Sequence, residues 1–368
     1  MASIAYWAAQ YRLISYVTTL FIVLQVERML DIQNKTPFST TLIPGLDKHG
    51  HSFAVVIIKG TFAIHDRAPV LVIAEEQQPI LPTDIFYGDP NKTSVKYEAD
   101  IAPLKTSLDV VLIGHAYAPS ARPANIVDAS LQVGAHKKII RVFGDRFWER
   151  DNLRWQASKA QPFERTALTY ENAFGGAVPA TAENEAVEFC TFNPIGKGFV
   201  GRNGQGFIEG LPLPNLENPA DLIENWNDQP APVGFGFIGR SWQPRLNYAG
   251  TYDQAWREQR MPLLPLDFNE KYYSGAHPDL QLANQPLDGE EVVATNLSES
   301  GLVRFSLPRY KFTASANIKG KSTTYQAVMD TIIIEPDDQR VQLTWRVAIP
   351  CARQFLHIEK ITIDWRSV

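Results

Sequence analysis

The chain has 368 residues, of which 45% are hydrophobic and 20% are charged, and this composition excludes wholesale disorder. Its net charge of −5 comes from 35 basic and 40 acidic side chains, without the run of Lys and Arg that is typical of a nucleic-acid-binding protein. Two cysteines are too few for a cysteine metal cluster or a disulfide-built scaffold, so we expect reduced thiols in a cytoplasmic protein.

The first 28 residues differ in character from the rest of the chain. Residues 14–26 form a largely apolar stretch with a basic residue before it and a charged pair after it. The stretch is shorter than the ~20 residues of a membrane-spanning helix, and it lacks a convincing small-x-small cleavage site of a signal peptide. Three interpretations stay open: a true start at Met29, a membrane anchor and a signal peptide. We favour Met29 over Met1, because the sequence from Met29 reads as the opening of a first strand.

The region from Met29 to about Val142 has the pattern of an all-β protein. Short apolar, β-branched segments separated by turn residues predict strands at residues 53–64, 70–74 and 108–117. Gly60 interrupts the first of these strands and predicts a β-bulge. Gly134-Ala135 predicts the turn of a hairpin between residues 126–133 and 137–143.

The central region, residues 175–268, is rich in glycine, proline and aromatic residues and keeps neither strand nor helix periodicity. We expect two short helices in it. One follows Asn218-Pro219, with Asn218 as N-cap, and the other spans residues 252–260 with Thr251 as its cap. A loop region of this length is usually functional or wrapped on a partner.

Strand patterns return towards the C-terminus. Residues 323–335 and 341–347 flank a turn, and in the second segment polar residues alternate with apolar ones, which predicts one buried face and one face in water. A last strand is expected at residues 355–365. The predicted fold is mainly β, an antiparallel sandwich-like scaffold with a long central loop region and a few short helices.

The expected domain organisation is an N-terminal extension, residues 1–28, followed by a β-rich domain, residues 29–368. This domain is either one unit or two subdomains that divide at about residue 150 (29–150 and 151–368).

Motifs for catalysis or cofactor binding are weak. Residues 196–201 spell G-x-G-x-x-G, but no strand precedes them and no helix follows, so we read them as a turning backbone. His49 and His51 lack further metal ligands nearby and read as loop histidines. The carboxylate pairs Asp84 with Asp89 and Asp145 with Glu149 fit solvated loops, although an acid–base pair is the alternative. We therefore expect no catalytic residues, no cofactor and no metal.

A series of motifs in a fixed order resembles a known family. In the first half they are Thr36-Pro37-Phe38, Asp84-Ile85-Phe86-Tyr87-Gly88-Asp89, Val142-Phe143-Gly144-Asp145-Arg146 and Tyr170-Glu171-Asn172-Ala173-Phe174-Gly175-Gly176. In the central region they are Asn193-Pro194-Ile195-Gly196-Lys197-Gly198-Phe199, Gly210-Leu211-Pro212-Leu213-Pro214-Asn215-Leu216-Glu217, Gly234-Phe235-Gly236, Trp242-Gln243-Pro244-Arg245, Gly250-Thr251-Tyr252-Asp253 and Leu263-Leu264-Pro265-Leu266-Asp267-Phe268. The chain resembles the type VI secretion accessory family, a domain of unknown function encoded beside spike and effector genes.

The resemblance implies an adaptor, or dedicated chaperone, that binds a type VI secretion effector and delivers it to the VgrG spike with its PAAR tip protein. It implies no catalytic residues. We expect no nucleic-acid partner, and no membrane contact unless residues 1–28 are an anchor. The alternatives are a carbohydrate-active hydrolase and an envelope-associated structural component of the secretion machine.

Aromatic and Arg side chains in the central region are the candidate partner-binding residues, because such side chains anchor protein interfaces. We expect Trp242, Arg245, Tyr252 and Trp256 in or near a partner-facing region, with Asn193 and Asn215 shaping its loops. The alternative is that these residues only lock a long loop onto the scaffold.

Overall fold

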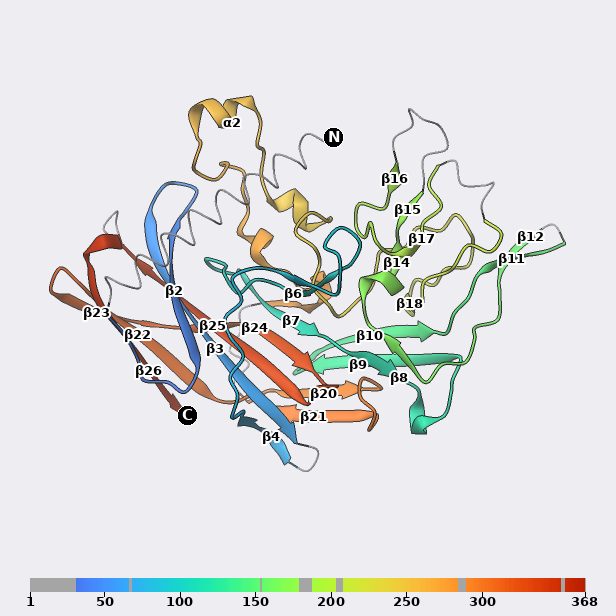
Figure 1. Cartoon of the computed structure of the whole chain (residues 1–368), viewed down its shortest axis with the longest axis horizontal. Helices are drawn as coiled ribbons and strands as arrows, with labels where there is room; N and C mark the ends of the chain where they lie inside the picture. Colours follow the sequence, from blue (N-terminus) through green and yellow to red (C-terminus); the bar gives the residue numbers. More distant parts are fainter. Residues whose placement is uncertain are drawn as a thin grey trace.

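The computed structural model describes residues 31–65, 68–152, 154–178, 187–202, 208–283, 289–351 and 355–367. The predicted extension, residues 1–28, lies outside the described residues. Within them the fold is mainly β, with one large curled sheet, a smaller second sheet and short two-stranded pairs (Figure 1). The prediction of a β-rich, sandwich-like scaffold with a long loop region is confirmed.

The large sheet contains twelve strands among the described residues. In spatial order they are β18 (Leu216–Glu217), β10 (His136–Phe143), β9 (Ile126–Val133), β20 (Glu291–Thr295), β21 (Leu302–Ser306), β4 (Ala68–Ile73), β3 (Ser52–His65), β25 (Arg340–Pro350), β24 (Val328–Glu335), β7 (Ser107–Leu112) and β19 (Gln281–Ala283), while β2 (Ser39–Leu46) also pairs with β3. Most pairs are antiparallel; β24 with β7 and the single contact between β4 and β21 are parallel.

The small sheet packs against the large one through aromatic rings. Its strands, in spatial order, are β1 (Asp31–Asn34), β26 (Ile358–Ser367), β22 (Tyr310–Ile318) and β23 (Lys321–Gln326). Phe312 of β22 lies 4.6 Å from Trp345 of β25, measured between ring centroids, and Phe38 lies 5.6 Å from Phe62 of β3. Aromatic pairs at such distances stabilise the interface between the layers beyond their buried area.

Short elements complete the fold. The two-stranded pairs are β5 (Ile85–Phe86) with β6 (Val95–Tyr97), β8 (His115–Tyr117) with β13 (Arg165–Ala167), β11 (Trp148–Asp151) with β12 (Arg154–Ala157), β14 (Phe174–Gly175) with β17 (Lys197–Gly198), and β15 (Ala177–Val178) with β16 (Glu188–Phe189). The helical elements are α2 (Gln254–Gln259) and the 3₁₀ helices η1 (Pro119–Ala121), η2 (Tyr170–Asn172), η4 (Arg245–Tyr248), η5 (Glu270–Tyr273), η6 (Pro278–Leu280) and η7 (Phe355–His357). No described helix is long and apolar enough to cross a membrane.

Strand β3 is buried on both faces, which explains its continuous run of β-branched residues. Val56 and Ile58 point into the main core, whereas Val55 and Ile57 belong to a second, smaller apolar cluster. Gly60 is not a bulge, because the pairing of β3 with β25 continues without a shift at this residue. A Cβ atom there would lie 2.9 Å from the nearest atom of the Phe38 ring, so the missing side chain makes room for that ring.

The hairpin predictions are confirmed. Strands β9 and β10 pair in register around Gly134, which has the positive φ of 55° that its turn needs. His49 and His51 lie in the β2–β3 hairpin loop, where Asp47 Oδ1 accepts hydrogen bonds from both of their backbone amides at 2.8 Å. The predicted strand at residues 323–335 is divided, because β23 ends at Gln326 and β24 begins at Val328.

Two helix predictions need correction. No helix follows Asn218 in the described residues; its side chain accepts a hydrogen bond from Ala220 N, and Glu217 Oε2 accepts one from Ile223 N at 2.8 Å. Tertiary contacts of Glu217 thus hold this segment in an irregular form. The second helix, α2, is present but capped by Asp253, which accepts from Trp256 N, and not by Thr251.

The polar face of β25 is also not in water as predicted. Gln342, Thr344 and Arg346 are each 3% exposed or less. The Arg346 guanidinium pairs with the buried carboxylate of Asp330, and Gln342 Nε2 donates to Glu335 Oε2 at 2.6 Å. Arg346 also donates to the carbonyl oxygen of Asp100 at 2.6 Å, so the loop after β6 covers part of this face and helps to bury a layer of polar groups on the large sheet.

Candidate functional site

Arg245 fastens the central loop region to η5 and to the segment that follows β6. It begins η4, is 4% exposed, and donates hydrogen bonds to the carbonyl oxygens of Ile238 and Tyr272, each at 2.8 Å. Its guanidinium also pairs with the buried carboxylate of Glu98, which follows β6 and accepts a second bond from Arg240 Nε at 3.0 Å. A loop held by these contacts has a fixed position on the scaffold.

Charge around Glu98 keeps this anchor ionised. Burial by itself would raise the pKa of the Glu98 carboxyl, because a charged group is poorly solvated inside the protein. The positive charges of Arg245, Arg240 and Lys105 outweigh burial and lower the pKa of Glu98 to about 2. Arg245 therefore keeps its counter-charge at any pH near neutrality.

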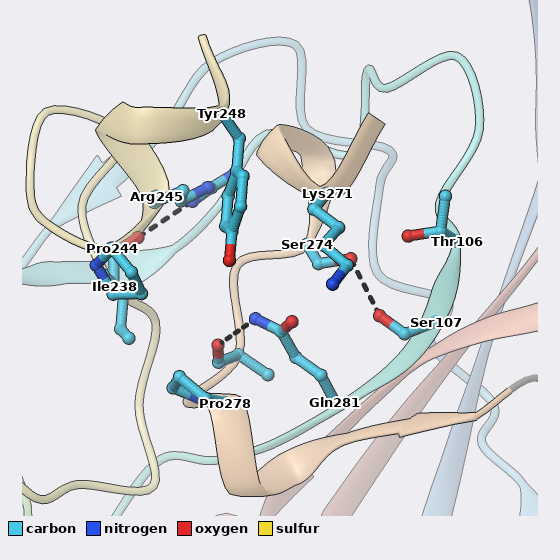
Figure 2. Close-up of a pocket in the computed structure, with 11 residues that line it drawn as sticks. Thr106, Ser107, Ile238, Pro244, Arg245, Tyr248, Lys271, Ser274, Pro278 and Gln281 are labelled. Atoms are coloured by element: carbon cyan, nitrogen blue, oxygen red, sulfur yellow. Dashed lines mark hydrogen bonds between the residues drawn. The ribbon is translucent and has the colours of Figure 1, made fainter. Parts of the chain in front are cut away.

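A cavity of about 360 Å³ lies beside η4, and we call it the η4 pocket (Figure 2). It is lined by residues from four parts of the chain: 106–107, 238–248, 271–278 and Gln281. These parts are far apart in the sequence and meet where β19 pairs with β7. The volume falls within the range of small-ligand pockets, about 300–1,000 Å³.

Two long polar side chains enter the η4 pocket from the helices above it. Tyr248 of η4 and Lys271 of η5 point into the cavity, and Gln281 faces them from the opposite side (Figure 2). Lys271 Nζ lies 5.9 Å from the centre of the Tyr248 ring. Ile238 and Pro244 supply apolar wall on the remaining side.

Hydroxyl and amide groups form the rest of the polar lining. Ser107 Oγ and Ser274 Oγ share a hydrogen bond of 2.9 Å, and Gln281 Nε2 donates to the carbonyl oxygen of Ala276 at 2.8 Å (Figure 2). Each of these groups keeps further hydrogen-bonding capacity. The bond between the two serines uses only one of their two hydroxyl protons, and the amide nitrogen of Gln281 carries a second proton. The pocket is thus lined for a polar ligand.

Trp242 supports the loop from the inside. It is 7% exposed, and its ring meets the ring of Tyr170 edge to face at 5.7 Å between centroids. Gly239 leaves room for the indole, because a Cβ atom on this residue would lie 3.0 Å from it. Trp242 can therefore act on a partner only through the shape of the loop, and its predicted part in partner binding stays a prediction.

Asn193 and Asn215 are buried and tie loops together. Asn193 Nδ2 donates to the carbonyl oxygens of Tyr170 at 2.7 Å and Phe174 at 3.0 Å. Asn215 Nδ2 donates to Phe143 O at 3.0 Å, while its Oδ1 accepts from Lys197 Nζ at 2.7 Å. These bonds fix loop backbones, and neither asparagine lines the η4 pocket.

Tyr252 and Trp256 lie together in a separate feature, which we call the α2 lobe and define as residues 250–268. Their rings meet edge to face at 4.7 Å, and Trp256 Nε1 donates to Leu263 O at 2.8 Å. In Figure 1 the lobe projects beyond the sheets. Four large apolar residues in or beside it are about half exposed: Leu246, Tyr252, Met261 and Leu266, at 47%, 47%, 48% and 60%.

The α2 lobe is fastened to the β2–β3 hairpin. Lys48 Nζ donates to Phe268 O at 3.0 Å, and the guanidinium of Arg260 donates to the carbonyl oxygen of Lys48. Within the lobe, Thr251 Oγ1 donates to Asp267 Oδ2 at 2.7 Å, and Thr251 lies two residues before Asp253, the N-cap of α2. Of the six predicted residues, the structure thus brings Tyr252 and Trp256 together, places Arg245 at the η4 pocket and leaves the other three inside.

Comparison with protein-family models identifies the family of the chain. The family model described as an uncharacterized protein conserved in bacteria (DUF2169) matches residues 49–346. The chain belongs to this family. The family description states no activity and no partner, no curated protein matches the chain, and no solved structure matches it.

The part of the chain that matches DUF2169 contains the η4 pocket, the α2 lobe and all six predicted residues. It also contains the G-x-G-x-x-G segment, where β17 pairs with β14 and Gly196 packs against Asn193 and the backbone of Ala173. These close contacts explain why a glycine is needed at position 196, and they agree with the interpretation of the segment as a turning backbone. In the described part of the chain, no three His, Cys, Asp or Glu side chains are arranged to hold a metal ion.

The carboxylates considered for acid–base chemistry have structural partners in this DUF2169 protein. Asp84 Oδ1 accepts from Ala99 N at 2.8 Å, and Asp89 Oδ1 accepts from Asn91 N at 3.0 Å. Asp145 Oδ1 accepts from Asn215 Nδ2 at 3.0 Å.

Reasoning from the sequence missed the groups that make the η4 pocket. Glu98 is distant in sequence from its partner Arg245, and nothing around it distinguishes a buried carboxylate from a surface one. Lys271 and Gln281 likewise read as ordinary loop residues. Only the position of Arg245 beside Trp242 in an apolar, proline-containing stretch carried a signal, because a charged residue buried there needs a counter-charge.

Proposed function

We propose that this DUF2169 protein is a non-catalytic adaptor, or dedicated chaperone, of a type VI secretion system. It binds an effector in the cytoplasm and loads it onto the VgrG spike, together with the PAAR tip protein. The order of the sequence motifs between Thr36 and Phe268 supports the proposal, because it resembles an accessory family encoded beside spike and effector genes.

The observation that carries the proposal is the α2 lobe. Its exposed apolar side chains sit on a segment that the β2–β3 hairpin and the Tyr252–Trp256 contact hold in place. A rigid scaffold that presents aromatic and aliphatic side chains on loops is a common arrangement in binding proteins. The lobe is therefore the surface that we assign to the effector.

Capture of the effector encoded beside this gene tests the proposal. An affinity-tagged chain is co-expressed with that effector, and the amount retained on the resin is compared between variants. We expect the double change Tyr252→Ser and Leu266→Ser to lower capture at least about tenfold, since exposed aromatic and aliphatic anchors dominate interface energies.

The matched control changes Val70→Ser and Leu302→Ser, which are 61% and 53% exposed on β4 and β21. This variant should capture the effector as the unchanged chain does, and melting curves should show that both variants are folded. Equal capture by the lobe variant and the control would remove the lobe from the interface. An unchanged chain that retains neither effector nor spike would contradict the adaptor function itself.

A further inference from the structure

The η4 pocket is positively charged and has no acidic residue in its lining. Its two cationic residues are Arg245 and Lys271. The charge of Arg245 is balanced by the buried carboxylate of Glu98, and each of its three guanidinium nitrogens already donates to a protein oxygen. Arg245 therefore forms the floor of the pocket but adds no uncompensated charge, although these bonds use only three of its five N–H groups.

Lys271 is different, because it forms no ion pair with any described residue. Its neighbour Glu270 lines another cavity, on the side of β23 and β24. The ammonium group has three donors and no acceptor, and Figure 2 shows it directed into the η4 pocket. One positive charge is thus available to a ligand there.

The hydroxyl groups that face the pocket can also donate hydrogen bonds, although each of them can accept as well. The hydroxyl of Tyr248 makes no hydrogen bond to a described residue, and one proton of the Ser107–Ser274 pair is free to donate. Thr106 adds a further hydroxyl at the rim (Figure 2). An ammonium surrounded by hydroxyl donors suits an anionic oxygen group, because charge-assisted hydrogen bonds are about twice as strong as neutral ones.

The number of charges favours a carboxylate over a phosphate. A phosphate group carries about −1.5 to −2 at pH 7 and is usually met by several cations or by the fork of a free guanidinium. The η4 pocket offers one ammonium, and the positive charge of the guanidinium beside it is already balanced by Glu98. The apolar wall of Ile238, Pro244 and Pro278 can hold a short hydrocarbon segment behind the charged end.

We propose that the η4 pocket binds a carboxylate on a short aliphatic stem, with Lys271 as its counter-charge and Tyr248 as a second donor. Acidic residues of a polypeptide have this chemistry, in the side chain of glutamate or at the chain end. The identification of that polypeptide as the effector rests on the proposed function; carboxylate binding by the pocket does not.

Three small probes test the site without any partner. N-acetyl-glutamate α-amide carries a side-chain carboxylate, N-acetyl-glutamine carries a terminal one, and N-acetyl-glutamine amide is the neutral control. Ligand-observed NMR titration of the full chain should detect binding of one or both acids and no binding of the amide. The better acid shows whether the side chain or the chain end is preferred.

Variants locate the binding. Lys271→Gln should lower the affinity for the better-binding acid by about tenfold, the loss expected for a charged hydrogen bond. Lys271→Arg should keep most of the affinity. Tyr248→Phe removes only a hydroxyl and should weaken binding less. The matched control is Lys92→Gln, which makes the same change of charge on an exposed loop outside the pocket and should leave binding unchanged.

Two results would overturn the carboxylate site: equal affinity for the acids and the neutral amide, or unchanged affinity in Lys271→Gln. Effector capture then separates the two proposals. If the unchanged chain retains no effector, the adaptor function fails while the NMR result stands. If Lys271→Gln loses the probes but retains the effector fully, the pocket binds carboxylates and the effector does not supply one.

Discussion

Arg245 and Glu98 carry opposite charges in the interior, where each alone would be costly. Taking a charge out of water costs several kcal/mol, and a partner with good hydrogen-bond geometry offsets that cost. Arg245 gains a carboxylate and two carbonyl oxygens, so no charge is left uncompensated. The central loop therefore depends on this ion pair for its position.

Removal of Arg245 should reveal this dependence. We expect Arg245→Met to lower the free energy of unfolding by about 3–5 kcal/mol, because Glu98 would remain buried with one of its two guanidinium partners gone. The matched control is Arg257→Met on the exposed surface of α2, where a change within about 0.5 kcal/mol is expected. Chemical denaturation of both variants gives the comparison; a similar small effect in both would show that Arg245 is not an anchor.

The pH dependence of stability tests the state of Glu98. Its pKa in the folded protein is about 2, below the ordinary value of 4.5. The ionised form thus stabilises the fold fully above about pH 5, and this contribution is lost as the pH falls towards 2. The shift corresponds to about 3 kcal/mol, since one unit is worth about 1.4 kcal/mol.

Glu98→Gln should be less stable than the unchanged chain near neutral pH and should lose less stability on acidification. Denaturation curves at pH 7, 5 and 3 measure the two slopes. The same loss in both proteins between pH 5 and pH 3 would mean that Glu98 titrates normally and that the ion pair contributes nothing.

At the scale of elements, close backbone contacts decide several turns. Gly144 follows β10, and a Cβ atom on it would lie 1.7 Å from the carbonyl oxygen of Gln161. No side chain can be accommodated at that distance without a shift of one backbone. The glycine of the Val142-Phe143-Gly144-Asp145-Arg146 motif is therefore explained by a contact with a segment later in the chain.

Gly144→Ala should lower the free energy of unfolding by more than about 4 kcal/mol or abolish soluble expression, because the strain is between backbones. Gly301→Ala is the control: its φ is +80° with nothing within 4 Å, so only the cost of a left-handed residue, about 1–2 kcal/mol, is expected. The two variants are compared by their soluble yield and by urea denaturation. A Gly144→Ala variant as stable as Gly301→Ala would mean that the two segments separate easily.

Local sequence signals were enough to predict most strands, but they did not reveal much of the site. The turn at Gly134 and the loop of His49 and His51 depend on neighbouring residues, so the sequence predicts them. The burial of Arg346 and the irregular path after Asn218 depend on contacts with Asp330 and Glu217 that only the folded chain brings close. Glu98 and Lys271 belong to the same class, because a pocket made from four distant segments has no local signature.

At the scale of the whole molecule, strand pairing crosses the division that the sequence suggested near residue 150. Strand β3 pairs with β25, and β9 pairs with β20. Since paired strands of one sheet share a core, we expect one cooperative transition in urea, followed by Trp fluorescence and by circular dichroism. Two separate transitions, or two stable fragments after limited proteolysis near residue 152, would support two subdomains instead.

The link between the α2 lobe and the β2–β3 hairpin has a mechanical consequence. A molecule that is pulled by the lobe would pass the force through Lys48 to β3, which pairs with β25 along eleven residues from Phe53 to Ala63. Load along such a pair shears many hydrogen bonds at once instead of opening them one after another. A partner held at the lobe would thus be tethered to a strand that, in the described part of the chain, pairs with β2, β25 and β4, and the tether would resist sudden displacement.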